Sequence, residues 1–195
     1  MDVLAKVAGM DPIEFRLKNI ADPRLRAVLE TAGKSFGWPR QKTQEGQGFG
    51  VAVGFEKGSY VATCAEIIVD AKSGAVRVVK LTEAFECGAI INPDGLRNQV
   101  VGAMIQGIGG ALFEAIEFED GRIKNPHFAT YRLPRFRDVP EIEAVLMDRK
   151  DIDAAGAGET PIMAVAPAIG NAIFDATGKR LNSLPLAPNG VFLHG

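Results

Sequence analysis

The sequence predicts an α+β fold in which antiparallel sheet segments pack with helices. Two helical patterns come first, strand-like segments follow, and a further helical pattern lies near the end of the chain. One long helical stretch separates the strand-like segments into two groups, but strands and helices do not alternate regularly. This order favours a mostly antiparallel sheet over a βαβ arrangement.

Two helices are expected within the first 38 residues. Asp11-Pro12 and Asp22-Pro23 each place an N-cap residue before a proline at the first helical position. Five apolar residues at helical spacing follow the second of these starts: Leu25, Val28, Leu29, Ala32 and Phe36. Gly37 is a typical helix stop.

Strands are expected after residues 39–48, a polar stretch that we interpret as a linker. The segments Phe49–Phe55, Val61–Val69 and Val76–Leu81 are rich in β-branched residues. In the second segment Glu66 falls among the alternate residues opposite the apolar set, which predicts a strand with one face in solvent.

A hairpin and one more strand are expected later in the chain. Asp120-Gly121 is a favoured two-residue hairpin turn. Glu141–Met147 alternates charged and apolar residues, as strands do. A closing helix is expected from about Ala164 or Pro167 to Thr177. We therefore divide the chain into a helical segment 1–38, the linker 39–48 and an α+β domain 49–195.

The long central helix begins at Asn92-Pro93 and is unusual in its glycine content. Glycines occupy positions 102, 107, 109 and 110, and each costs a helix interior about 1 kcal/mol relative to alanine. Either the helix breaks at Gln106-Gly107, or its backbone passes close to another group. That group is a packed helix on one interpretation and a ligand on the other, and the glycines alone leave both open.

Composition excludes several classes of protein. A chain of 195 residues with 47% hydrophobic and 24% charged residues has an ordinary globular composition and can bury a core. A net charge of −2 gives no indication of a nucleic-acid partner. No apolar stretch is long enough for a membrane span, and the N-terminus lacks a signal-peptide pattern. We expect a cytoplasmic protein.

No metal ligand set is predicted from the residues. Cys64 and Cys87 are too few and too far apart for a zinc or iron–sulfur motif. They form either a disulfide or, as we favour, two buried thiols. His127 and His194 have no ligand partner at short spacing, which favours ordinary surface or core histidines.

Glu159 is the candidate catalytic residue, in the sequence Gly-Ala-Gly-Glu-Thr-Pro of residues 156–161. A carboxylate between glycines and a helix start can act as a general base towards a bound group. It can equally be a helix-start carboxylate stabilised by the helix dipole. Burial would raise the pKa of such a carboxyl group, whereas the helix start would lower it, and the sequence does not decide between them.

Three segments in a fixed order resemble one family. They are CGAIINP at residues 87–93, QVVGAMIQGIGGALFE at 99–114 and GAGETPIMAVAPAIGNAIFDATGKRLNSLP at 156–185. Together they are similar to the C-terminal part of the molybdenum-cofactor-binding subunit of the xanthine dehydrogenase and aldehyde oxidase family. Within it, the isoquinoline 1-oxidoreductase and nicotinate dehydrogenase types are most similar. MDPIEFRLKN and the segments after it extend the resemblance nearly end to end.

The resemblance implies roles for particular residues. Glu159 matches the family's general base beside the molybdenum, in the hydroxylation of a nitrogen heterocycle or aldehyde with water. Gln106 matches a glutamine that binds the pterin part of the cofactor. Gly107 and Gly109, and the Gly156 to Gly158 turn, would let backbone N–H groups approach an anionic ligand. The implied cofactor is molybdopterin cytosine dinucleotide or a related molybdenum cofactor, held without protein metal ligands.

The resemblance also implies missing partners, because the family's large subunit is several times longer than this chain. The remaining contacts would come from the rest of that subunit or a companion subunit, and an iron–sulfur subunit would relay electrons. We expect exposed apolar faces that favour self-association. The alternatives are a truncated or orphan domain without catalysis of its own, and a non-enzymatic interaction module.

Overall fold

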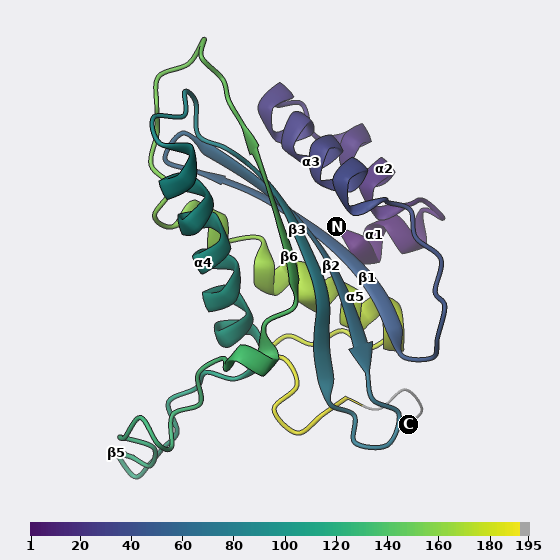
Figure 1. Ribbon diagram of the computed structural model, residues 1–195. Coiled ribbons are helices and arrows are strands. Elements are labelled where there is room, and N and C mark those ends of the chain that lie inside the picture. The colour runs from purple at the N-terminus through teal and green to yellow at the C-terminus, as the bar shows by residue number, and fades with distance from the viewer. Residues whose placement is uncertain (192–195) are drawn as a thin grey trace.

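The structure, a computed structural model, describes residues 1–191 as a sheet with helices on both faces (Figure 1). Helices and strands follow one another as α1 (Asp2–Val7), α2 (Pro12–Asn19), α3 (Pro23–Phe36), β1 (Gln47–Glu56), β2 (Ser59–Val69), β3 (Val76–Glu86), α4 (Pro93–Leu112), β4 (Phe118–Glu119), β5 (Arg122–Ile123), the 3₁₀ helix η1 (Phe136–Asp138), β6 (Glu141–Met147), the 3₁₀ helix η2 (Thr160–Ile162) and α5 (Val165–Thr177).

The main sheet has the strand order β1-β2-β3-β6. β1 and β2 are antiparallel, as are β2 and β3, which confirms the mostly antiparallel sheet. β6 is parallel to β3, with Ala144 opposite Glu83. The chain reaches it through α4 and the β4–β5 hairpin, so one crossover connection is added to the expected pattern.

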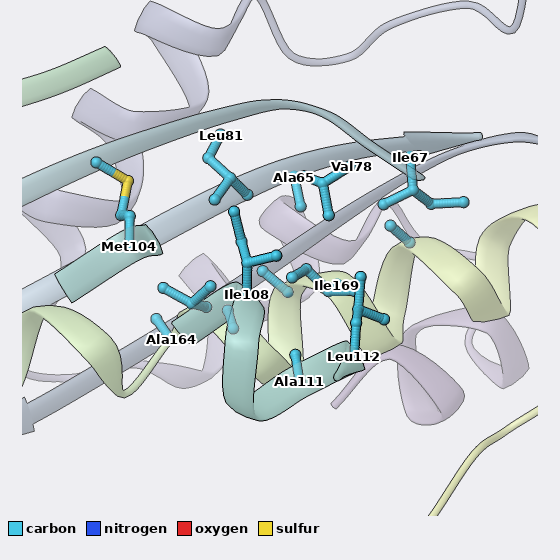
Figure 2. Packing of buried hydrophobic residues seen from close by; sticks show 14 of the residues in the cluster. Ala65, Ile67, Val78, Leu81, Met104, Ile108, Ala111, Leu112, Ala164 and Ile169 are labelled. Atoms are coloured by element: carbon cyan, nitrogen blue, oxygen red, sulfur yellow. The ribbon is translucent and has the colours of Figure 1, made fainter. Parts of the chain in front are cut away.

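Two apolar layers flank the sheet. α1, α2 and α3 lie on one side of it, and α4 and α5 on the other (Figure 1). Figure 2 shows the second layer, where Ile108 of α4 and Ile169 of α5 lie in one cluster with Leu81 of β3. The first layer joins α3 to the opposite face of the sheet. The N-terminal helices thus share a core with the strands, and our division into three segments stays a prediction.

The N-terminal helices begin and end at the residues that signalled them. The Asp11 carboxylate accepts the backbone N–H of Ile13 at 2.8 Å, and the Asp22 carboxylate accepts that of Arg24 at 2.8 Å. Gly37 ends α3 in the left-handed conformation, with φ at 79°. The apolar stripe of α3 is buried along its whole length. These predictions are confirmed.

The expectation that β2 has a solvent face is wrong. Glu66 is only 6% exposed, and its carboxylate accepts hydrogen bonds from Arg40 at 2.5 Å and from Gln47 at 2.7 Å. Gln47 is itself buried and belongs to β1, which therefore starts two residues before the expected Phe49. In a sequence pattern, buried polar residues that hydrogen-bond to one another cannot be told from surface residues.

α4 is unbroken from Pro93 to Leu112, with the Asn92 side chain capping the N–H of Gly95 at 2.9 Å. The break at Gln106-Gly107 therefore does not occur. The hairpin turn is as predicted, because Asp120 and Gly121 both have positive φ, as a type I′ turn requires. The hairpin extends away from the sheet and the helices (Figure 1).

The contact between α5 and β1 depends on two glycines. A Cβ atom on Gly48 would lie 2.2 Å from the carbonyl oxygen of Ala172, and one on Gly50 would lie 2.2 Å from that of Ala168. α5 therefore lies directly on the strand backbone. Among residues 1–191, no helix is long and apolar enough to cross a membrane.

Candidate functional site

The turn that carries Glu159 is held against the β1–β2 hairpin and the end of β3. The Ser59 hydroxyl donates to the carbonyl of Gly156 at 2.7 Å, and the Thr160 hydroxyl donates to the carbonyl of Glu56 at 3.2 Å. Glu159 lies between these two anchors, at the residue that precedes η2. Its backbone is thus fixed by neighbours on both sides.

The Glu159 carboxylate forms an ion pair with the ammonium group of Lys57, in the turn between β1 and β2. Both side chains are exposed, at 67% for Glu159 and 64% for Lys57. The hydrogen bond and the positive charge of Lys57 lower the pKa of Glu159. Neither burial nor a capping interaction governs this carboxyl group, and it is ionised at neutral pH.

The glycines on either side leave this surface open. Gly156 and Gly158 are exposed, and a Cβ atom added to either would meet no other atom within 4 Å. No group of the chain itself therefore requires glycine here. Their predicted role, which is to admit a ligand to the backbone, stays a prediction.

Gln106 lies on the exposed side of α4, and the next residue, Gly107, is buried against α5. A Cβ atom on Gly107 would lie 2.6 Å from the Cβ of Val165, so this glycine permits close helix packing. At Gly109 the nearest atom would be a carboxylate oxygen of Glu114, at 1.9 Å. Because α4 is continuous, the N–H groups of both glycines lie within the helix hydrogen-bond ladder. Their contacts with a cofactor stay predictions.

A small cavity of about 290 Å³ lies where the three segments of the resemblance meet. Its lining comes from Cys87 to Asn92, from the first turns of α4 including Gln99, and from Ala154, Ala155 and Ala157. The Ala155 N–H donates to the carbonyl of Cys87 at 2.7 Å, which joins the first segment to the residue directly before the third. The fold thus brings residues of the range 87–99 together with residues of the range 154–157 in one mainly apolar hollow beside the Glu159 turn.

The backbone at Gly88 shows why this junction needs its sequence. Gly88 has a φ of 77°, and a Cβ atom there would lie 2.1 Å from the carbonyl oxygen of Asp153. The Ala89 N–H donates to the carbonyl of Ile152 at 3.0 Å. Any larger residue at position 88 would separate the end of β3 from the segment that leads to Glu159.

The thiols and histidines form no metal site within residues 1–191. Cys64 and Cys87 are free and buried, as we favoured. Burial raises the pKa of the Cys64 thiol to about 12 and also raises that of Cys87, so both stay protonated. His194 lies outside the described residues.

Lys57 and Ser59 are the members of the site that the sequence did not reveal. Lys57 is 102 positions away from its partner Glu159, and Ser59 is 97 away from Gly156. The dipeptide Lys57-Gly58 is a turn signal between two strands, and both residues have positive φ. That signal locates the turn but does not show what the turn contacts.

The greater part of the chain matches one class of domain. Residues 11–140 match the family model described as molybdopterin cofactor-binding domain, and the chain belongs to this family. The matched region covers β1, β2, β3 and α4, but it ends before β6 and Glu159.

Similar proteins narrow the class to subunits of molybdenum hydroxylases. A nicotinate dehydrogenase subunit from Pseudomonas putida is 32% identical over 95% of this chain and 17% of its own length. The beta subunit of isoquinoline 1-oxidoreductase from Brevundimonas diminuta is 29% identical over 96% of this chain and 24% of its own length. The aldehyde oxidoreductase molybdenum-binding subunit of Escherichia coli is 31% identical over 95% of this chain and 26% of its own length.

Solved structures agree on the fold. Aldehyde oxidoreductase from Desulfovibrio gigas has a TM-score of 0.58 and 33% identity, over 65% of this chain and 14% of that chain. Quinoline 2-oxidoreductase from Pseudomonas putida has a TM-score of 0.60 and 25% identity, over 65% of this chain and 17% of that chain. The chain thus spans about a quarter or less of the length of each relative named here.

Proposed function

We propose that this chain forms part of the cofactor-binding wall of a molybdenum hydroxylase, with Glu159 as its general base. The reaction is the oxidative hydroxylation of a nitrogen heterocycle or an aldehyde with water as the oxygen source. The names of the relatives support these substrate classes, since they include nicotinate, isoquinoline and aldehyde enzymes.

One observation supports the proposal above all: an ionised carboxylate on a rigid, open turn. Glu159 is exposed and paired only with Lys57, while hydrogen bonds from Ser59 and Thr160 fix the turn on either side. A general base must be ionised and within reach of the proton that it accepts. A carboxylate used only to start a helix would instead cap it, and Glu159 makes no side-chain capping bond.

The residues fit one wall of a cofactor site. The cofactor, when bound, supplies the redox centre, and the resemblance assigns the metal's ligands to the pterin rather than to the protein. The open glycines 156 and 158 leave room beside Glu159, and Gln106 presents an exposed amide on α4. In our proposal Gln106 hydrogen-bonds the pterin and Glu159 holds the proton. The cytosine dinucleotide form is part of the proposal.

Partner chains complete the proposed site. The relatives are named as subunits, and we propose that the rest of the large subunit, or a companion subunit, covers the Glu159 face. An iron–sulfur subunit then relays electrons, in the cytoplasm. The β4–β5 hairpin and the loop after it expose Phe118, Phe128 and Phe136, which favours self-association of the isolated chain.

The second candidate is a domain that folds without catalysis of its own. The exposed aromatic residues on the hairpin and the loop after it favour it, because they suit a surface that packs against another chain. Metal and pterin analysis separates the two candidates, carried out on the purified chain and on complexes isolated with it from its host. Molybdenum and pterin that appear with a partner chain support the enzyme. Complexes without either would support the non-catalytic domain.

A further inference from the structure

Arg24, in the first turn of α3, contacts two of the segments that form the Glu159 site. Its guanidinium donates two hydrogen bonds to the Glu86 carboxylate, at 2.5 Å and 2.8 Å, and one to the carbonyl of Gly58, at 2.9 Å. Glu86 ends β3, and Gly58 lies in the turn between β1 and β2. α3 lies on the face of the sheet opposite to α4 and α5 (Figure 1). A helix outside the site is thus bonded to two of its parts.

Glu86 links Arg24 to the segment that lines the hollow beside the Glu159 turn. Its side chain is only 2% exposed. The oxygen that accepts one of the Arg24 bonds also accepts the backbone N–H of Gly88, at 2.5 Å. The carbonyl of the residue before Gly88 accepts the N–H of Ala155. The Arg24–Glu86 pair therefore supports the junction between the end of β3 and the segment that leads to Glu159.

The turn between β1 and β2 depends on outside contacts, because Lys57 is an unusual residue for its backbone. Lys57 and Gly58 have φ of 50° and 83°, as in a type I′ turn, whose first position favours Asn, Asp or Gly. Asp120, with φ of 49° in the β4–β5 turn, is a residue of this kind. A lysine in this conformation is strained, and such residues persist where the surrounding structure fixes them.

Arg24 fixes this turn from one side and the Glu159 segment fixes it from the other. Arg24 holds the carbonyl of Gly58. On the opposite side the Ser59 hydroxyl donates to the main chain three residues before Glu159, and Lys57 forms its ion pair with Glu159. A movement of the Gly58 carbonyl therefore displaces the ammonium group of Lys57 relative to the Glu159 carboxylate.

Arg24 is itself held in one orientation. Its guanidinium lies 4.2 Å from the centre of the Tyr60 ring, and the Tyr60 hydroxyl donates to the carboxylate of Asp22, the N-cap of α3, at 3.0 Å. The planar guanidinium presents its N–H groups as a rigid fork, which reaches Glu86 and Gly58 at the same time. A lysine carries the same charge on one small ammonium group and lacks this fork.

We propose that Arg24 is a positioning residue for Glu159. It holds the turn of Lys57 through the Gly58 carbonyl, and it holds the end of β3 through Glu86. This inference rests on the proposed function, in which Glu159 is the general base. A base is effective only while it is held within reach of the proton that it accepts. Arg24 itself takes no part in the proton transfer.

Arg24→Lys in the isolated chain tests the proposal, because it keeps the charge and loses the fork. Lys57 lowers the pKa of Glu159, so a displaced Lys57 should let that pKa rise. We expect carboxyl NMR titration to show a higher Glu159 pKa in Arg24→Lys, with a shift smaller than that of Lys57→Gln. Arg26→Lys is the matched control on α3, where the guanidinium bonds the main chain at the end of α2. It should leave the Glu159 pKa unchanged.

Glu86→Asp carries the test if Arg24→Lys does not fold. It keeps the negative charge, but its side chain is one methylene shorter and loses its contacts with the Arg24 guanidinium and the Gly88 N–H. It should raise the Glu159 pKa in the same direction. Far-UV circular dichroism shows which variants are folded. An unchanged Glu159 pKa in the folded variants would overturn the positioning role of Arg24.

The assembled enzyme supplies a second readout. Arg24→Lys should lower kcat on the order of tenfold and leave KM and molybdenum content nearly unchanged, since a misplaced base slows the reaction without weakening binding. Loss of molybdenum in proportion to kcat would instead show a purely structural role and contradict the proposal. The proposed function fails in a different way. Glu159→Gln would then keep full turnover, while the pKa shifts would still show that Arg24 holds Glu159 in place.

Discussion

Lys57 and Glu159 lie 102 positions apart in the sequence and form an ion pair that joins the β1–β2 turn to the start of η2. The pair places a positive charge next to the proposed general base. It therefore sets the pH range in which Glu159 is ionised, although Lys57 itself takes no proton from the substrate.

Replacement of Lys57 should shift the pH dependence of the assembled enzyme. Lys57 lowers the pKa of Glu159, so Lys57→Gln should raise that pKa towards its ordinary value. A base acts in its ionised form, and the acid-side loss of kcat should therefore move to higher pH. Carboxyl NMR titration of the isolated chain measures the same shift directly. Lys57→Arg keeps the charge and should restore the original profile; an equal shift in both variants would contradict the ion-pair account.

The contact of α5 with β1 should be intolerant of a single methyl group. A Cβ atom at Gly50 would lie 2.2 Å from the carbonyl oxygen of Ala168, and the helix backbone cannot move aside cheaply. Gly50→Ala should lower the free energy of unfolding by about 3 kcal/mol, measured by urea denaturation.

Gly102 supplies the matched control for that substitution. It lies on the exposed side of α4, with nothing within 4 Å of an added Cβ atom. Gly102→Ala should stabilise the protein by about 1 kcal/mol through helix propensity. A Gly50→Ala variant as stable as the original protein would show that the packing of α5 on β1 is looser than described.

Glu83 should make the protein less stable as the pH rises. Its side chain is fully buried on β3, one oxygen accepts the Thr63 hydroxyl at 2.6 Å, and the other has no partner. Burial raises its pKa well above the ordinary value of 4.5, so the folded state favours the protonated acid. The resulting stability is fully present below pH 4.5 and is lost as the pH rises towards the folded-state pKa.

Urea unfolding between pH 5 and pH 9 checks this expectation. The slope contributed by Glu83 approaches about 1.4 kcal/mol per pH unit at most. Glu83→Gln should remove that slope and leave the protein more stable than the original at alkaline pH. Glu117→Gln changes an exposed carboxylate and should alter neither the slope nor the stability at alkaline pH. An unchanged slope in Glu83→Gln would mean that the buried acid does not titrate in this range.

Arg24 should be required for the stability of the end of β3. It donates two hydrogen bonds to Glu86, at 2.5 Å and 2.8 Å, and the Glu86 side chain is only 2% exposed. Arg24→Gln leaves a buried carboxylate without its cation and should cost about 3 kcal/mol in urea unfolding. The double variant Arg24→Gln with Glu86→Gln should recover part of this loss. A loss as large or larger in the double variant would contradict the pairing.

The helices could be predicted from the sequence because their signals are local. Asp11, Asp22 and Gly37 act within a few residues of themselves, and the apolar stripe of α3 repeats at helical spacing. The hairpin turn at Asp120-Gly121 was predictable for the same reason. The second half of β3 was not, since buried Thr82, Glu83 and Glu86 do not look like core residues.

The site was predictable only in part, because its geometry depends on distant contacts. Glu159 and its glycines stand out in the sequence, but Lys57 and Ser59 do not. Gly107 shows the reverse case. Its unusual position in a helix was evident, and only the structure shows that Val165 occupies the space its missing side chain leaves.

The role of Glu159 is tested most directly by Glu159→Gln in the assembled enzyme, with turnover and molybdenum content measured on the same sample. We predict that most turnover is lost while molybdenum content stays nearly unchanged, because the amide keeps the shape of the turn but cannot accept the proton. Gln106→Ala should have the opposite effect: it should reduce the cofactor content more than the turnover per bound molybdenum. Full turnover in Glu159→Gln, or loss of molybdenum in proportion to activity, would contradict the assignment of Glu159 as the general base.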